Sequence, residues 1–136
     1  MFRTLDDTIS VWGQVTPEDI AMAAGAGFTT IVNNRPDGEE PGQPTGAAIA
    51  AATRAAGLEY VAIPVDHSGF REEQAAAMAE ALGAADGPVL AFCRSGTRST
   101  FLWALARSRM GDDGAVLTAK AAAAGYDLSP IRAALD

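Results

Sequence analysis

Residues 88–98 read Pro-Val-Leu-Ala-Phe-Cys-Arg-Ser-Gly-Thr-Arg, an apolar run followed at once by a polar loop. A short, wholly apolar run is typical of a central strand that is covered on both faces. We therefore predict a buried strand over residues 88–92 and a helix over residues 98–110. The loop between them would lie at the carboxyl end of a central strand, which is a favoured ligand position in open α/β sheets.

Strand and helix patterns alternate along the chain on both sides of this stretch, as in an α/β layer architecture. Strands are predicted at residues 9–15, 28–33, 58–65 and 88–92, and helices at residues 17–25, 45–56, 71–85, 98–110, 113–124 and 129–135. We expect a single three-layer domain over residues 1–136, with a mostly parallel central sheet of four to five strands flanked by helices.

Particular residues support individual elements of this prediction. Thr16 and Thr45 are predicted N-caps, because a threonine hydroxyl can accept a hydrogen bond from the first turn of a helix. The segment over residues 34–44 holds three prolines and two glycines and is predicted to be a loop. Trp12 and Trp103 are expected in the core or at its rim, and at the rim Trp103, in the helix after the cysteine loop, would face partly outward.

Composition excludes several classes of function. A net charge of −7 and an isoelectric point near 4.5 argue against nucleic acid as a partner, because phosphate backbones require a basic face. No apolar stretch reaches about 18 residues and the first residues lack an apolar signal core, so we expect a cytoplasmic protein with no membrane partner. With one cysteine and one histidine, neither a disulfide nor a metal centre is expected, and no cofactor is predicted.

The loop after the central strand gathers features that favour negative charge. Cys93 precedes a helix N-terminus, where backbone N–H groups and the helix dipole attract anions. Gly96 allows a tight turn, and Arg94 and Arg98 add forked cationic donors. Ser99 is predicted to donate its hydroxyl to the sulfur. Thiols in such surroundings ionise more readily, so Cys93 is predicted to be a catalytic thiolate inside an anion-binding loop.

Two other interpretations of Cys93 remain open. A free cysteine usually packs as a small buried hydrophobe. That interpretation fits poorly here, because two flanking arginines cannot be buried unpaired beside an inert thiol. The loop could also bind an anion without catalysis.

The string Cys-Arg-Ser-Gly-Thr-Arg-Ser over residues 93–99 resembles the active-site loop of rhodanese sulfurtransferases. It also resembles the Cys-x5-Arg loop of cysteine phosphatases, although only four residues separate Cys93 from Arg98 and Phe92 stands where phosphatases usually have histidine. Residues 33–44 are similar to a segment of bacterial beta-lactamase hydrolase-like proteins, and the similarity runs over residues 10–110. This resemblance implies a dual-specificity-phosphatase-like fold.

The shorter loop leads to our first hypothesis, a rhodanese-type sulfurtransferase. In it, Cys93 takes the outer sulfur of thiosulfate or a persulfide, and Arg94 and Arg98 stabilise the anionic donor. The loop residues Ser95, Gly96 and Thr97 are counted with the substrate-binding residues, as is Ser99. No second cysteine is present to resolve a persulfide, so the acceptor would be an external thiol or cyanide. In some relatives this domain is fused to a metallo-hydrolase or dioxygenase, which implies a separate dioxygenase or oxidoreductase partner.

The second hypothesis is a cysteine phosphatase that uses Cys93, Arg98 and Asp66. Asp66 follows a predicted strand, roughly where dual-specificity phosphatases carry a general acid, but aspartate is also common in turns and we favour the turn. Arg35 is predicted to reach the site or to pair with Asp37, and we favour a structural role for this loop in which Arg35 or Gln43 borders the site. The third hypothesis is a non-enzymatic module that senses anions or thiol oxidation.

Overall fold

In a computed structural model that describes residues 2–135, the chain forms a five-stranded sheet flanked by helices. In the order β1-β2-β5-β3-β4, the strands are β1 (Arg3–Asp6), β2 (Ile9–Trp12), β5 (Val89–Phe92), β3 (Thr30–Asn33) and β4 (Glu59–Ala62). Strand β1 is antiparallel to β2, and the other neighbours are parallel. The predicted fold class is therefore confirmed.

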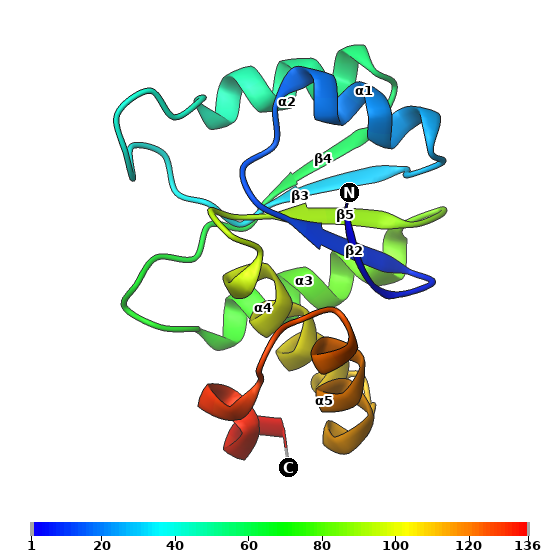
Figure 1. Ribbon diagram of the computed structural model, residues 1–136, viewed down its shortest axis with the longest axis vertical. Helices are drawn as coiled ribbons and strands as arrows, with labels where there is room; N and C mark the ends of the chain where they lie inside the picture. The colour runs from blue at the N-terminus through cyan, green and yellow to red at the C-terminus, as the bar shows by residue number, and fades with distance from the viewer. Residues whose placement is uncertain (1, 136) are drawn as a thin grey trace.

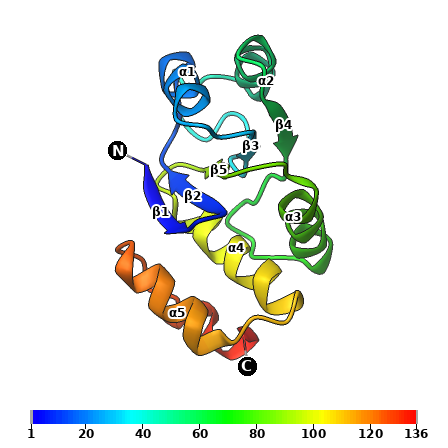
Figure 2. The same ribbon diagram turned by 90° about the vertical axis from the view of Figure 1, so that its right-hand side faces the viewer.

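Helices cover both faces of the sheet (Figure 1). They are α1 (Pro17–Gly25), α2 (Gly46–Ala55), α3 (Glu72–Ala84), α4 (Thr97–Arg109), α5 (Gly114–Ala123) and the 3-10 helix η1 (Ser129–Leu135). Helices α1 and α2 lie on one face, whereas α3 and α4 lie on the other, and α5 packs outside α4 (Figure 2).

Strand β5 is central and buried on both faces, as its apolar sequence predicts. Val89 and Ala91 belong to the core beneath α3 and α4, and Leu90 and Phe92 belong to the core beneath α1 and α2. Because the chain alternates faces along a strand, each side chain of β5 meets a helix layer. The strand is thereby fixed, and so is the position of the loop that follows it.

Both predicted N-caps are confirmed. The Thr16 hydroxyl accepts a hydrogen bond from the Asp19 N–H, and the Asp19 carboxylate accepts one from the Thr16 N–H, which makes a reciprocal capping box. The Thr45 hydroxyl accepts from the Ala48 N–H. The segment over residues 34–44 contains no regular helix or strand, as predicted.

One feature differs from the sequence predictions, and another was left open by them. Strand β1 was not predicted, because four residues with a half-exposed pattern give a weak signal on their own. Trp103 is fully buried, so of the two predicted positions, core and rim, it occupies the core. Helix α4 is enclosed by α3 on one side and by α5 and η1 on the other, so even its second face is covered.

Within residues 2–135, no helix has both the length and the apolar character needed to cross a membrane.

Candidate active site

Cys93 lies directly after β5 and is 1% exposed. Its sulfur accepts a hydrogen bond from the Gly96 N–H at 3.1 Å, and its own N–H donates to the Trp12 carbonyl at 3.4 Å. Helix α4 begins at Thr97, so the Cys93 sulfur lies at a helix N-terminus. The predicted position of the cysteine, between a central strand and a helix, is the observed one.

The turn from Cys93 to Thr97 depends on two glycines. Gly96 has a φ of +91°, in the left-handed region that side chains disfavour. Gly13, in the segment after β2, faces the Arg94 carbonyl so closely that a β-carbon there would lie 2.9 Å from the oxygen. Neighbouring backbone therefore packs directly against the cysteine loop.

Arg98, in the first turn of α4, is held by two acceptors. Its Nη1 and Nη2 donate to the two carboxylate oxygens of Glu39 at 2.7 and 2.8 Å, and Nη1 also donates to the Val65 carbonyl at 2.6 Å. The hydrogen bonds to Glu39 outweigh burial and raise the pKa of Arg98, and its interactions with the Cys93 side chain raise it further. Arg98 is thus a fixed cation next to the sulfur.

Arg35, at the end of β3, shares the same carboxylate. Its Nε donates to Glu39 at 2.9 Å, its Nη2 to Glu40 at 3.0 Å and its Nη1 to the Gln14 side chain at 3.0 Å. Burial lowers the pKa of Arg35, but the bonds to Glu39 and Glu40 outweigh that effect and leave it raised. Of the alternatives predicted for Arg35, pairing with Asp37 is not the observed one, because Asp37 accepts from the Gly46 N–H at 2.7 Å.

Glu39 is the anionic centre of this cluster. Hydrogen bonds from Arg98, followed by those from Arg35, lower its pKa to about 2 although burial opposes the shift. Two exposed groups lie at its edge: His67 Nε2 is 3.7 Å from Glu39, and Arg94 Nη2 is 3.6 Å from Glu40. Glu39 therefore balances the guanidinium charges of Arg35 and Arg98.

Ser99 does not contact the sulfur, contrary to the prediction. Its buried hydroxyl donates to Asn34 Oδ1 at 2.8 Å, and Asn34 Nδ2 donates to the Ile63 carbonyl at 3.0 Å. Asn34 and Ile63 belong to the segments after β3 and β4, so Ser99 lies on the side of α4 that faces those segments. Its role here is to connect α4 to those two segments.

The hydroxyls of Ser95 and Thr97 lie 3.1 Å apart in the same turn. The backbone carbonyl of Ser95 accepts a hydrogen bond from the Tyr126 hydroxyl at 3.1 Å. Ser95 and Thr97 form the loop after Cys93 together with Arg94 and Gly96, and Tyr126 contacts this loop from the segment after α5.

Asp66 is exposed and makes its hydrogen bonds within its own turn. Its Oδ1 accepts from the Ser68 N–H at 2.9 Å and from the Ser68 hydroxyl at 2.5 Å. These bonds lower the pKa of Asp66, so the carboxyl is ionised at neutral pH. The observed geometry is that of a turn aspartate and not of a protonated acid aimed at Cys93.

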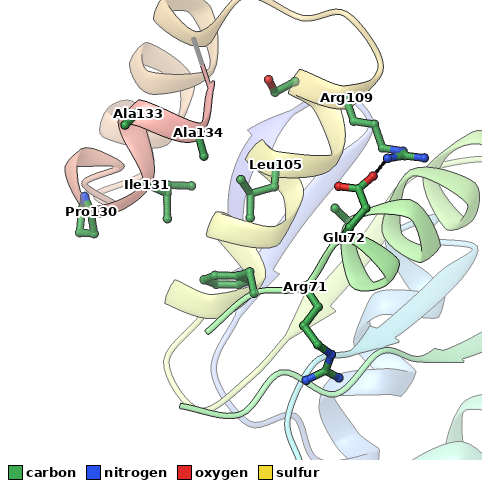
Figure 3. A pocket seen from close by; sticks show the side chains of 11 residues that line it. Arg71, Glu72, Leu105, Arg109, Pro130, Ile131, Ala133 and Ala134 are labelled. Atoms are coloured by element: carbon green, nitrogen blue, oxygen red, sulfur yellow. Dashed lines mark ion pairs between the residues drawn. The ribbon is translucent and has the colours of Figure 1, made fainter. Parts of the chain in front are cut away.

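A cavity of about 660 Å³ lies elsewhere, between α3, α4 and η1 (Figure 3). Phe70, Leu105 and Ile131 supply apolar walls, and the ion pair of Arg109 with Glu72 lies at its edge. The Cys93 loop does not line this cavity.

Two residues of the site were missed from the sequence. Glu39 stood four residues after Arg35 in an irregular loop, so no helical spacing marked them as partners. Tyr126 belongs to the segment after α5, far from Cys93 in sequence, and nothing local marks it. The one available signal for Glu39 was that Arg35, in the same loop, needs an acidic partner and that Glu39 lies only four residues away.

Comparisons with known proteins point to a phosphatase-like domain. Residues 1–110 match the family described as "Beta-lactamase hydrolase-like protein, phosphatase-like domain". A beta-lactamase hydrolase-like protein of Agrobacterium fabrum is 36% identical over 107 residues, which cover 79% of this chain and 25% of that protein. A beta-lactamase hydrolase-like protein of Xylella fastidiosa is 39% identical over 101 residues, which cover 74% of this chain and 23% of that protein. The chain thus spans about a quarter of the length of these relatives.

Solved structures agree with this fold. The crystal structure of a "putative phosphatase" from Neisseria meningitidis has a TM-score of 0.84 and 34% identity, covering 98% of this chain and 94% of that one. The crystal structure of P. aeruginosa TpbA has a TM-score of 0.66 and 20% identity, and the match covers 98% of this chain and 80% of that one. At this identity the likeness supports the fold alone. The chain belongs to the family of beta-lactamase hydrolase-like proteins, and residues 1–110 correspond to its phosphatase-like domain.

Proposed function

We propose that the protein is a cysteine-dependent phosphatase in which Cys93 is the nucleophile. The observation that carries this proposal is the Gly96 N–H 3.1 Å from the Cys93 sulfur, at the N-terminus of α4 and next to the fixed cation Arg98. Such a loop stabilises negative charge on the sulfur and on an oxyanion bound against it. The phosphatase-like family match supports this function over sulfur transfer.

In the proposed reaction the Cys93 sulfur attacks phosphorus and the bond to the leaving oxygen breaks, which leaves a phosphocysteine. Water then attacks the phosphorus and releases inorganic phosphate. Arg98 and the loop N–H groups stabilise the charge that spreads over the phosphoryl oxygens. Arg94, which is exposed at the rim, contacts the rest of an anionic substrate.

The state of Asp66 defines the substrate class. A poor leaving group such as an alkoxide needs a proton from a general acid, but the Asp66 carboxylate accepts its hydrogen bonds from Ser68 within its own turn. We therefore infer that the substrates carry leaving groups of low basicity, as in aryl phosphates, acyl phosphates and phosphoanhydrides. Alkyl phosphates would react slowly.

The test compares kcat/KM for p-nitrophenyl phosphate, acetyl phosphate and an alkyl phosphate, in the wild type and in Cys93→Ser. We expect the first two to be hydrolysed at least about tenfold faster than the alkyl ester, and Cys93→Ser to fall to background. Turnover that survives Cys93→Ser would overturn the proposal. Fast alkyl phosphate hydrolysis that is slowed in Asp66→Asn would overturn the inferred substrate class.

A second candidate is sulfur transfer, favoured by the short interval between Cys93 and Arg98. Only four residues separate them, so the loop offers fewer N–H groups to a tetrahedral phosphoryl group. In this reaction the Cys93 thiolate attacks the outer sulfur of thiosulfate and sulfite leaves with the bonding electron pair. Cyanide or a thiol then removes the sulfur and regenerates the thiolate. No general acid is required, which also suits the state of Asp66.

Intact-mass spectrometry separates the two candidates, because Cys93 is the only cysteine. The protein is incubated with acetyl phosphate in one sample and with thiosulfate in another, and Cys93→Ser is treated in parallel. The gain of one phosphoryl group on the wild type alone supports the phosphatase. The gain of one sulfur atom, with no phosphoryl adduct and no phosphatase turnover, replaces it with the sulfurtransferase.

A further inference from the structure

Tyr126 lies against the outer side of the cysteine loop, although it comes from the segment after α5. Its hydroxyl donates to the Ser95 carbonyl at 3.1 Å. That carbonyl belongs to the same peptide unit as the Gly96 N–H, which donates to the Cys93 sulfur at 3.1 Å. One peptide plane is therefore held at both ends, by a phenol on the outside and by the sulfur on the inside.

The geometry of a peptide unit couples these two bonds. In a planar trans peptide the C=O and N–H groups point in opposite directions. A hydroxyl that holds the Ser95 carbonyl outward consequently aims the Gly96 N–H inward at the sulfur. Gly96 has a φ of +91° and, as a glycine, meets little steric resistance to rotation about this bond. Without the Tyr126 hydrogen bond, rotation of the peptide plane would therefore be opposed mainly by the weak hydrogen bond to sulfur.

The Tyr126 hydroxyl fits closely against Gly96. A β-carbon at Gly96 would collide with the hydroxyl oxygen. The next carbonyl, that of Gly96, is held separately by the N–H and hydroxyl of Thr100 at 2.9 and 2.8 Å. The two carbonyls that flank the donor are thus both fixed, one by α4 and one by Tyr126.

Tyr126 is itself held in place by the two ends of the chain. Its N–H donates to the Ala121 carbonyl at 2.9 Å, and the Arg3 guanidinium lies 5.3 Å from the centre of its ring. Arg3 also donates to the Ala124 carbonyl at 3.1 Å. Burial raises the pKa of Tyr126, and so its hydroxyl keeps its proton and remains a donor at neutral pH.

We propose that Tyr126 is a positioning residue that orients the Ser95–Gly96 peptide so that its N–H stabilises negative charge on the Cys93 sulfur. It acts through the loop and does not touch the reacting atoms. The proposal rests on the proposed function in one respect only, that the charge on Cys93 is used in catalysis. It assigns a role in the site to a residue outside the 1–110 range matched by the family.

The experiment measures alkylation of Cys93 by iodoacetamide and by iodoacetate at a pH below the midpoint of the wild-type alkylation profile, where the rate follows the fraction of Cys93 present as thiolate. It requires no turnover. Tyr126→Phe removes the hydroxyl and keeps the ring under Arg3. Tyr60→Phe is the matched control, since Tyr60 is the only other tyrosine and its hydroxyl accepts from Asn33 Nδ2 at 3.0 Å. We expect Tyr126→Phe to slow both alkylations about 2- to 10-fold, the range that one lost hydrogen bond produces, and Tyr60→Phe to leave them unchanged.

Two further measurements separate positioning from general destabilisation. Protection of Cys93 by inorganic phosphate should require a higher phosphate concentration in Tyr126→Phe, by a similar factor. The midpoint of thermal unfolding is recorded for both variants, because a merely structural role would lower it without changing alkylation well below the transition.

Alkylation rates and phosphate protection that are equal in the wild type and Tyr126→Phe would overturn the proposal, as would equal slowing in Tyr60→Phe. If Tyr126→Phe alone slows alkylation while the wild type shows no phosphatase turnover, the positioning role stands and the proposed function fails.

Discussion

Glu39 is the residue through which the loop after β3 contacts Arg98 of α4. Replacing it with Gln removes the charge shared by Arg35, whose side chain is 1% exposed, and Arg98. Removing one partner of a buried ion pair costs about 3–5 kcal/mol, and we expect on the order of 2–3 kcal/mol here because Glu40 still pairs with Arg35. Urea unfolding monitored by tryptophan fluorescence measures the change in the free energy of unfolding.

The control for this prediction is Glu73→Gln, which removes an exposed partner of Arg71. An exposed pair contributes little, so no measurable loss of stability is expected. Equal stability of Glu39→Gln and Glu73→Gln would contradict the view that Glu39 holds the two arginines.

Ser99 provides a sharper test of the site, because the sequence predicted a contact with the sulfur and the structure shows one with Asn34. Ser99→Ala leaves Asn34 Oδ1 without its buried donor, which should cost about 1–3 kcal/mol. The rate of Cys93 alkylation should stay at the wild-type value. A stable variant with slowed alkylation would restore the original prediction.

The sequence was informative about single residues only where chemistry was local. Cys93, Gly96 and Arg98 were found because one loop holds them all, and the caps were found because a cap needs only four residues. The partners of Arg35 and Ser99 were not found. Each had several acceptors in reach along the chain, and the choice among them was made by how β3, β4 and α4 pack.

Among the elements, β1 and α5 fix the outer side of the cysteine loop. Lys120 of α5 contacts Asp6 of β1 at 3.1 Å, and Arg3 of β1 contacts Ala124 and the Tyr126 ring. Arg3→Gln removes the second set of contacts. We expect Cys93 alkylation to slow by about twofold, less than in Tyr126→Phe, because an exposed cation–π contact is worth about 0.5–1 kcal/mol and the hydroxyl bond survives.

Arg54→Gln is the matched control for this variant, since Arg54 lies 5.9 Å from the Tyr60 ring in a similar contact. It should not change the alkylation rate. A rate for Arg3→Gln that equals that of Arg54→Gln would show that β1 has no effect on the loop.

Elements whose sequence carries a regular apolar pattern were predictable. Elements and orientations that depend on which other segments pack against them were not. Strand β5 was recognised because burial on both faces leaves an unbroken apolar run. Strand β1 was missed because its pairing with β2 involves only four residues at an edge. Trp103 lies in the core, one of the two positions that the sequence left open, because α5 and η1 cover the side of α4 that would otherwise meet water.

At the scale of the whole molecule, the arginine–glutamate cluster links stability to pH. Glu39 has a pKa of about 2 in the folded protein and an ordinary value near 4.5 when unfolded. A carboxyl whose pKa is lower in the folded state stabilises the fold above the unfolded pKa, and this contribution is lost as pH falls through the folded pKa. The contribution of Glu39 should therefore be complete above about pH 5 and decline toward pH 2.

Asp6 adds to the same trend. Burial raises its pKa, but hydrogen bonds from Thr8 and Lys120 outweigh burial and lower it. We expect the free energy of unfolding of the wild type to fall steadily between about pH 5 and pH 2, and that of Glu39→Gln to fall less steeply over the same interval because one of the responsible carboxyls is gone. Urea unfolding at several pH values in constant salt provides the slopes. Parallel slopes for the two proteins would mean that Glu39 is equally easy to protonate in the folded and unfolded states, which is incompatible with its three hydrogen bonds from Arg35 and Arg98.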